Sequence, residues 1–463
     1  MDQLTVLDAG FLMAEDSDRH VSLAIGAVAI INGAAPDYRA LTTVLAERIR
    51  KIPRCTQVLR TQPFDVGAPK WVDDPGFDVA RHVRRVALPR PGGDAELFHV
   101  VADALERRLD RDRPLWECWV IEGLRGNRWA ILMKIHHCMA DGISATRMLA
   151  RLCDEIGEDV FACRAPKPMR SVRPHRHLRP VPQSAPARGP LHELWRAAGT
   201  VTDAAARTLG GAAELVAGLL RPAGVSSLVG PVSTSRRYHA VTVSFAAVEQ
   251  VCHKFGVTVN DVALTAITEG FRSVLLHRGD QPRPDSLRTL VPVSVRSPDT
   301  VDQPGNRISV LLPYLPVDVD DPIDQLQVVH SRLTRTKRSG QRQAGSVVTS
   351  AASYLPYVLS SFAIRLLTRL PQRGIVTLAT NVQGPSRPLR MMNRQVARLL
   401  PIPPIALQLR TGIAILSYAD DLVFGITADY GAVPDVEQLA AGIQRAVARL
   451  EALSQDSVLL FAK

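Results

Sequence analysis

The chain has 463 residues, of which 46% are hydrophobic and 22% are charged, and this is the composition of a soluble globular protein. The length is too great for one ordinary core and predicts two domains of about 200 residues each. The net charge of +11 suggests nucleic acid as a partner, but +7 of it lies within residues 164–190. The remaining +4 is spread over the rest of the chain, which argues against a nucleic-acid-binding surface.

The first residues, MDQLTVLDAG, contain neither a basic segment nor a long apolar one, so no secretory signal is expected. The longest apolar stretches, such as LAIGAVAII, reach about half of the roughly 20 residues that a membrane-spanning helix needs. We therefore expect a cytoplasmic protein that is soluble or peripherally bound to a membrane. The six cysteines include no C-x-x-C pair, which favours reduced thiols over a disulfide framework or a structural zinc site.

The first half of the chain is predicted to mix strands and helices. Residues 21–31, VSLAIGAVAII, have the pattern of a strand, and a helix with Leu41, Leu45 and Ile49 on its apolar face follows. A second helix begins near Asp94, and its apolar stripe is Leu97, Val101, Leu105 and Leu109. The segments WECWVIEG and WAILMKI then predict two strands.

Residues 164–190 predict a linker that divides the chain. They contain six Arg, one Lys and seven Pro but no acidic residue. Proline at this density prevents a packed helix or sheet. The charge could attract anionic lipid or a phosphorylated substrate at about 1 kcal/mol per basic residue, or the segment could be only a solvated connector. Residues 191–235 follow as a helical connector, and their first part, 191–220, is weakly amphipathic.

The second half, residues 236–463, again predicts a mixture of helices and strands. One helix has Leu264, Ile267, Phe271 and Leu275 on a single face. Strands are predicted at LRTLVPVSV, RISVLLPYLPV and GIVTLATNV, and a hairpin pairs GIAILSY with LVFGITA. A last helix buries an apolar stripe from Val436 to Leu450. The sequence thus predicts two α/β halves, 1–163 and 236–463.

The stretch ILMKIHHCMADGISATRML, residues 131–149, carries the most specific motif. A buried strand ends in His136 and His137, and a helical pattern begins just after Asp141 and Gly142. Adjacent residues at a strand end point in opposite directions, so one histidine is expected to face a given cavity. Gly142 permits close backbone approach, whereas Asp141 either caps the helix or, if buried, needs a cation.

Three other interpretations of the histidines remain open at this point. Buried histidines are most often hydrogen-bonded core residues. A metal site would need a third ligand, and none appears nearby at convincing spacing. A dyad of Cys138 with a histidine is disfavoured because chain neighbours rarely reach one another productively. The G-x-S-x-G, P-loop and G-x-G-x-x-G motifs are all missing from the sequence.

The pattern H-H-x-x-x-D-G in a chain of two halves resembles the acyl-CoA-dependent acyltransferase superfamily, which includes chloramphenicol acetyltransferase and peptide-synthetase condensation domains. The segments LTVLDAGFLMAED, PKWVDDPGFDVARHV, LDRDRPLWE, VTVNDVALTAI, LRTLVPVSVRS, GNRISVLLPYLPVD and TNVQGPSRPL, in order from residue 4 to about 390, resemble the bacterial wax ester synthase/diacylglycerol acyltransferase family, and especially the mycobacterial triacylglycerol synthases. The linker departs from the family, and Gln383 replaces a more usual apolar or proline residue. The resemblance implies an α/β fold of two chloramphenicol-acetyltransferase-like halves with mixed sheets and an active-site channel between them.

The resemblance also implies an activity. A long-chain acyl group would pass from acyl-CoA to diacylglycerol, or also to a fatty alcohol, with His137 as general base and His136 as a structural or orienting residue. No covalent acyl-enzyme, metal or cofactor is implied. The expected partners are acyl-CoA, the lipid acceptor and the surface of the membrane's inner face or of a lipid droplet. The alternatives are acyl transfer from a carrier-protein thioester and an inactive protein that binds lipid surfaces.

The remaining candidate residues have both a structural and a functional interpretation. Asn260 and Asp261 open a helix, where capping by Thr258 or Asn260 is the ordinary role, but the resemblance implies an active-site role for Asn260. Pro114, Leu115 and Trp116 resemble a pocket-shaping segment of the family and equally suit core packing. By the resemblance, Asp141 would be a structural anchor paired with Arg296. Weaker candidates are Ser294, Asn306 and Asn381.

Overall fold

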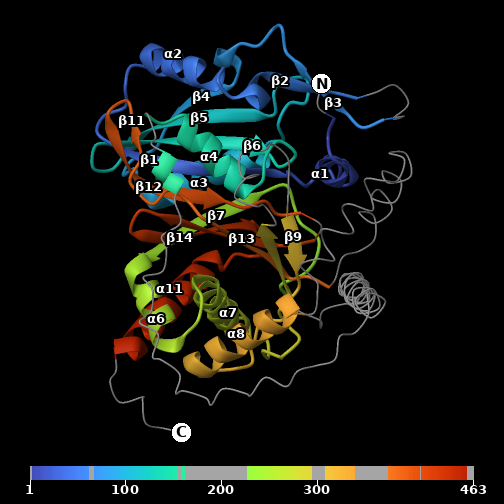
Figure 1. Ribbon diagram of the computed structural model, residues 1–463, viewed down its shortest axis with the longest axis vertical. Helices are drawn as coiled ribbons and strands as arrows, with labels where there is room; N and C mark the ends of the chain where they lie inside the picture. Colours follow the sequence, from blue (N-terminus) through green and yellow to red (C-terminus); the bar gives the residue numbers. More distant parts are fainter. Residues whose placement is uncertain are drawn as a thin grey trace, which may run out of the picture.

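The computed structural model describes residues 3–61, 67–154, 158–161, 227–294, 308–338, 374–406 and 408–455. Two six-stranded sheets lie one above the other in Figure 1, the first built largely from the start of the chain and the second from its end. A two-stranded sheet of β2 (Gln57–Arg60) and β3 (Lys70–Asp73) and short 3₁₀ turns at Pro53–Thr56, Val79–Arg81 and Glu158–Phe161 complete the first part.

The first sheet has the order β11 (Arg390–Met391), β12 (Arg394–Ile402), β1 (Ala24–Asn32), β6 (Arg128–His136), β5 (Trp116–Leu124) and β4 (Val83–Ala87). Alternate residues of β1 and β6 face opposite cores, as the period of a strand requires. On one face they pack against α1 (Val6–Ser17), α2 (Tyr38–Ile49) and α4 (Gly142–Arg151). On the other they meet α3 (Asp94–Glu106) and residues of the second sheet.

The second sheet has the order β7 (Arg236–Ser244), β14 (Asp421–Asp429), β13 (Thr411–Tyr418), β10 (Thr377–Val382), β8 (Thr289–Ser294) and β9 (Ile308–Leu311). Four helices cover one face: α6 (Phe245–Phe255), α7 (Val259–His277), α8 (Pro322–Arg338) and α11 (Val436–Gln455). Helices α7 and α11 approach closely because glycines face each other. A Cβ on Gly442 would lie 2.7 Å from the Cα of Gly270.

One pair of strands crosses between the halves of the sequence. Strands β11 and β12, orange in Figure 1, lie beside the blue and cyan strands of the first sheet. Strand β12 pairs antiparallel with β1, so that Val28 is opposite Leu400. The predicted halves 1–163 and 236–463 therefore do not coincide with the two sheets, since residues 390–402 complete the first one. Strand β12 was not predicted, and no local pattern in it identifies β1 as its partner.

Most predicted elements are confirmed. The apolar face of α2 is fully buried, the hairpin of β13 and β14 turns at Ala419, and β6 ends at His136. Helix α3 ends at Glu106, so Leu109 lies beyond it, although its side chain is still buried. Helices α1 and α8 were not predicted. The linker 164–190 and the predicted helix at 191–220 lie outside the described residues.

We also compared the helices with the thickness of a lipid bilayer. Within the described ranges, none is both long and apolar enough to cross a membrane.

Candidate active site

A cavity of about 100 Å³ lies between the two sheets and is lined by residues of both. The first sheet contributes Ile25, Gly26 and Ala27 of β1 and the end of β12. The second contributes side chains of β10 and β13. The turn between β6 and α4, which carries the histidine motif, closes one side of the cavity.

His137 is the histidine that lines this cavity. It follows the last residue of β6, and its backbone N–H donates to the Leu23 carbonyl at 2.9 Å. His136 is not among the described residues that line this cavity and is 1% exposed. The expectation that only one of the two side chains faces a given cavity is confirmed.

The imidazole of His137 is packed against an aromatic ring. Phe11 of α1 stacks on it with ring centroids 4.2 Å apart and an interplanar angle of 18°. Burial lowers the pKa of His137 to about 4, although Asp141 favours the charged form. The imidazole is therefore uncharged at neutral pH and able to accept a proton.

His136 is held by its backbone and by a carboxylate of α1. Its Nδ1 accepts a hydrogen bond from the Cys138 N–H at 3.1 Å, so the proton of the neutral ring is on Nε2. That Nε2 lies 3.4 Å from Oε2 of Glu15, which is 2% exposed. The resemblance assigned His136 a structural or orienting role, and this environment suits such a role.

Glu15 joins three parts of the first half. Besides facing His136, its carboxylate accepts from Nη2 of Arg111 at 2.8 Å and from the Leu23 N–H at 3.1 Å. Burial by itself raises the pKa of Glu15, but the adjacent imidazole of His136 and the hydrogen bonds from Arg111 and the Leu23 N–H lower it to about 2. Only family resemblance marked this segment in the sequence, and no spacing rule pointed to Glu15.

Asp141 and Gly142 shape the start of α4. Asp141 is the N-cap, is buried, and accepts from the Ser144 N–H at 2.9 Å. A Cβ on Gly142 would lie 2.8 Å from Cγ2 of Val382, so this glycine allows the turn to approach β10 of the second sheet. Both predicted roles, capping and close approach, agree with the structure.

Two cations, Lys134 and Arg147, lie within seven residues of Asp141 in the sequence. Lys134 is buried, and its ammonium donates to the Ala104 carbonyl at 2.7 Å and to the Arg107 carbonyl, at the end of α3. Arg147 is half-buried, with its guanidinium 5.2 Å from the ring centre of Phe161. Arg296 lies outside the described residues, so its pairing with Asp141 stays a prediction.

The segment Pro114–Leu115–Trp116 lies next to the histidine motif. Trp116 is 1% exposed, donates from Nε1 to the Cys55 carbonyl at 2.8 Å and stacks on His82. The Leu115 carbonyl accepts from the His136 N–H at 2.9 Å. None of the three is among the described residues that line the cavity of His137. Burial and the indole hydrogen bond agree with the core-packing interpretation of this segment, and its pocket role stays a prediction.

Asn260 and Asp261 lie in the first turn of α7. Thr258 is the N-cap, and Asp261 completes a capping box and accepts from Nδ1 of His330 at 2.8 Å. Asn260 is half-buried and is not among the described residues that line the cavity of His137. Its active-site role stays a prediction.

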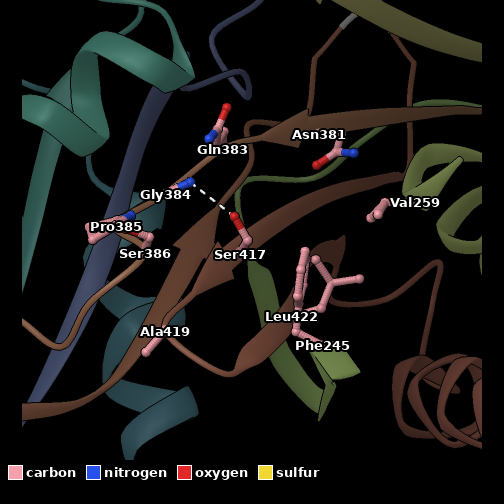
Figure 2. A pocket seen from close by; sticks show the side chains of 10 residues that line it. All are labelled: Phe245, Val259, Asn381, Gln383, Gly384, Pro385, Ser386, Ser417, Ala419 and Leu422. Atoms are coloured by element: carbon pink, nitrogen blue, oxygen red, sulfur yellow. Dashed lines mark hydrogen bonds between the residues drawn. The ribbon is translucent and has the colours of Figure 1, made fainter. Parts of the chain in front are cut away.

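Asn381 belongs to a second pocket. Figure 2 shows it near Gln383 and Ser417, in an open pocket of about 290 Å³. Along β10, Asn381 alternates with Thr380 and Val382, which line the cavity of His137, so the two hollows use different sides of this strand. The side chain of Ser294 and all of Asn306 lie outside the described residues.

Cys138 is poorly suited to act as a nucleophile. Its side chain is buried, and this burial raises the pKa of the thiol well above its ordinary value. A thiolate, the reactive form, is therefore scarce at neutral pH. The geometry favours the neutral imidazole of His137 as the reactive group of the motif.

Known proteins resemble this chain along nearly its whole length. The family model of the wax ester synthase/diacylglycerol acyltransferase catalytic domain matches residues 4–263, and that of the WS/DGAT C-terminal domain matches residues 304–451. The chain is 56% identical over 461 residues to the probable diacylglycerol O-acyltransferase tgs1 of Mycobacterium tuberculosis, covering 98% of this chain and 97% of the relative. A second relative from that organism, the putative diacylglycerol O-acyltransferase Rv3371, is 54% identical and matches 100% of this chain and 94% of its own length.

Solved structures share the fold. The wax ester synthase/diacylglycerol acyltransferase from Marinobacter aquaeolei VT8 superposes with a TM-score of 0.68 at 25% identity, over 98% of this chain and 100% of that one. The first condensation domain of the CDA synthetase superposes with a TM-score of 0.60 at 17% identity, over 98% of this chain and 96% of that one. The second similarity concerns the fold alone.

We expect Glu15→Gln to destabilise the protein by about 3 kcal/mol at pH 7, because a buried carboxylate whose pKa falls from 4.5 to about 2 stabilises the folded state by that order. The folded-state pKa is lowered, so this contribution is complete above pH 4.5 and is lost as the pH falls toward about 2. The stability difference from wild type should therefore narrow below pH 4.5 in urea titrations.

Asp16→Asn provides the matched control. Asp16 contacts the same Arg111 at 2.8 Å, but its side chain is 59% exposed, so its loss should change stability by less than about 1 kcal/mol. Equal effects of the two substitutions would contradict the central role of Glu15.

Proposed function

The chain belongs to the wax ester synthase/diacylglycerol acyltransferase family, and we propose that it transfers a long-chain acyl group from acyl-CoA to diacylglycerol with His137 as the general base. The product is triacylglycerol. The observation that carries the proposal is the uncharged imidazole of His137, which lines an apolar cavity between the sheets.

The chemistry follows from the position of His137. The imidazole takes the proton of the acceptor hydroxyl as the oxygen attacks the thioester carbonyl. The tetrahedral intermediate then collapses, the C–S bond breaks, and the coenzyme A thiolate leaves and recovers the proton from the imidazolium. General base catalysis of this kind typically contributes about 10²–10⁴-fold to the rate. The reaction needs no acyl-enzyme intermediate.

Thr380 is suited to stabilise the oxyanion of that intermediate. Its side chain lines the same cavity, and its hydroxyl makes no hydrogen bond to any described residue. Four other lining residues, Pro292, Pro401, Pro403 and Pro404, have no backbone N–H to donate. A hydroxyl that donates to a developing oxyanion is worth far more in a dry site than in water.

The rest of the lining suits an acyl chain. Ile25, Ala27, Leu378, Ile402 and Leu416 present apolar side chains to the cavity. Such walls bind hydrocarbon and exclude water, which would otherwise compete with the alcohol for the thioester. A fatty alcohol also combines one hydroxyl with a hydrocarbon chain, so wax ester formation belongs in the same assay.

The proposed site of action is a lipid surface, reached peripherally from the cytoplasm. Diacylglycerol and triacylglycerol both partition into lipid, and the basic linker 164–190 carries charge of the sign that anionic headgroups attract.

We expect His137→Ala to lower kcat by at least about 10²-fold, because the other titratable residue of the motif that lines the cavity, Asp141, is engaged in capping α4. His136→Ala should be milder, since that ring faces Glu15 and is not among the described residues that line the cavity. The assay uses radiolabelled acyl-CoA with diacylglycerol and hexadecanol as acceptors, and circular dichroism monitors folding. Equal, small losses in both variants would refute the base assignment. Turnover of free acyl-CoA would argue against dependence on a carrier protein, and His137-dependent turnover against an inactive lipid-binding protein.

We expect Thr380→Val, which keeps the shape of the side chain but removes its hydroxyl, to lower kcat by about 10²–10³-fold with little change in KM. Thr380→Ser keeps the hydroxyl and should retain activity within a few-fold. Similar activity of the valine and serine variants would exclude Thr380 as the oxyanion donor.

Replacing the basic residues within 164–188 by neutral ones should weaken binding to anionic vesicles, and more strongly at low salt, because screening reduces the attraction. Vesicle flotation at two salt concentrations measures the effect. Unchanged flotation would leave the linker as a passive connector.

A further inference from the structure

We propose that Phe11 is a positioning residue for His137: its ring holds the plane of the imidazole and keeps water from one face of it. This inference rests on the proposed role of His137 as general base. It concerns a residue whose side chain cannot make a conventional hydrogen bond and takes no part in the chemistry itself.

The contact is an offset or parallel stack. With 4.2 Å between centroids and 18° between planes, the two rings cover each other, and such aromatic pairs contribute about 0.5–1.5 kcal/mol beyond burial. The backbone of His137 is already fixed by its hydrogen bond to Leu23. That bond does not fix the side-chain torsions, and the stacked ring of Phe11 restricts the directions in which the imidazole can point.

Phe11 is itself held by residues from distant parts of the chain. It packs against a small cluster of Ala14, Val21, Leu23, Val232 and Ala406. Val232 and Ala406 come from beyond the linker, whereas the other three belong to the first half. The position of the ring therefore depends on the docking of both halves, which also forms the cavity.

Two residues of helix α1, spaced one helical turn apart, face the two histidines of the motif. Phe11 and Glu15 are separated by four residues and so lie on the same face of the helix. Phe11 contacts His137, and Glu15 faces His136 at 3.4 Å. The helix start is fixed by Thr5, whose hydroxyl accepts from the Asp8 N–H at 3.1 Å. One helix thus supports both histidines of the motif.

The charges around His137 come from few elements. Asp141 at the start of α4 raises the pKa of the imidazole, and neighbouring His136 lowers it. On α1, Glu15 is paired with Arg111, and Asp8 is buried beside Thr5. Among the described residues lining the cavity, only His137 and Asp141 are titratable. Burial has the largest effect on the pKa of His137, and the ring of Phe11 is part of that burial.

The pH dependence of kcat/KM for acyl transfer tests the proposal. Wild type should stay active down to about pH 5, because protonation of a base with a pKa of about 4 begins only below that. Phe11→Ala admits water, so the pKa rises toward 6.5 and the acidic limb should move up by about one to two pH units. At pH 7 kcat should fall by about tenfold or more from lost orientation. KM should change little.

Two further variants make the test decisive. Leu12→Ala removes a similar apolar volume from the adjacent position of α1, and it should lower thermal stability without moving the acidic limb. Phe11→Leu keeps an apolar cover without a flat ring, so its limb should stay near that of wild type while kcat falls several-fold. If Phe11→Ala does not fold, Phe11→Leu still tests the orienting role of the ring.

The possible results distinguish failure of the Phe11 proposal from failure of the proposed function. An acidic limb that does not move in Phe11→Ala, or moves equally in Leu12→Ala, overturns the proposal. A Phe11→Leu variant with wild-type kcat and profile overturns the orienting role. If wild type itself transfers no acyl group, the proposed function fails instead.

Discussion

The antiparallel pairing of β12 with β1 is the constraint on which the site depends. It carries a strand from the second half of the sequence into the first sheet, and Pro401, at its end, reaches the cavity. The Tyr238 hydroxyl donates to the Pro401 carbonyl at 2.9 Å, and a Cβ on Gly425 would collide with that carbonyl. The two sheets are therefore joined at the wall of the cavity, where small movements would change its shape.

Burial has two opposite effects on His137 as a base. The lowered pKa keeps His137 uncharged and ready at neutral pH, but it also reduces the proton affinity of the ring. Asp141 partly offsets that loss, since its negative charge favours the imidazolium form of the ring. Exclusion of water has a second benefit, because water in the cavity would compete with an alcohol for a bound thioester.

Much of the fold could be predicted from the sequence where the signal was local. The strand ending in His136, the cap at Asp141, the helix that follows and the hairpin at Ala419 all follow from periodicity and turn chemistry within a few residues. Alternation of side chains along a strand predicted that one of the two histidines faces the cavity, and the family resemblance selected His137. The family resemblance, carried by short motifs, pointed to the same motif.

Other features depended on contacts between distant residues. Periodicity reports that a side chain is buried and does not identify its neighbours. The sequence therefore left open whether Trp116 lines a pocket or packs in the core, and only the structure shows its indole N–H donating to the Cys55 carbonyl. The pairing of β12, the stack of Phe11 on His137 and the carboxylate of Glu15 beside His136 join residues far apart in the chain. By itself the sequence determined which residues form the histidine motif and that the two histidines face opposite sides of the strand end. The tertiary structure alone decided what surrounds them, because burial and the resulting pKa depend on partners that packing brings together.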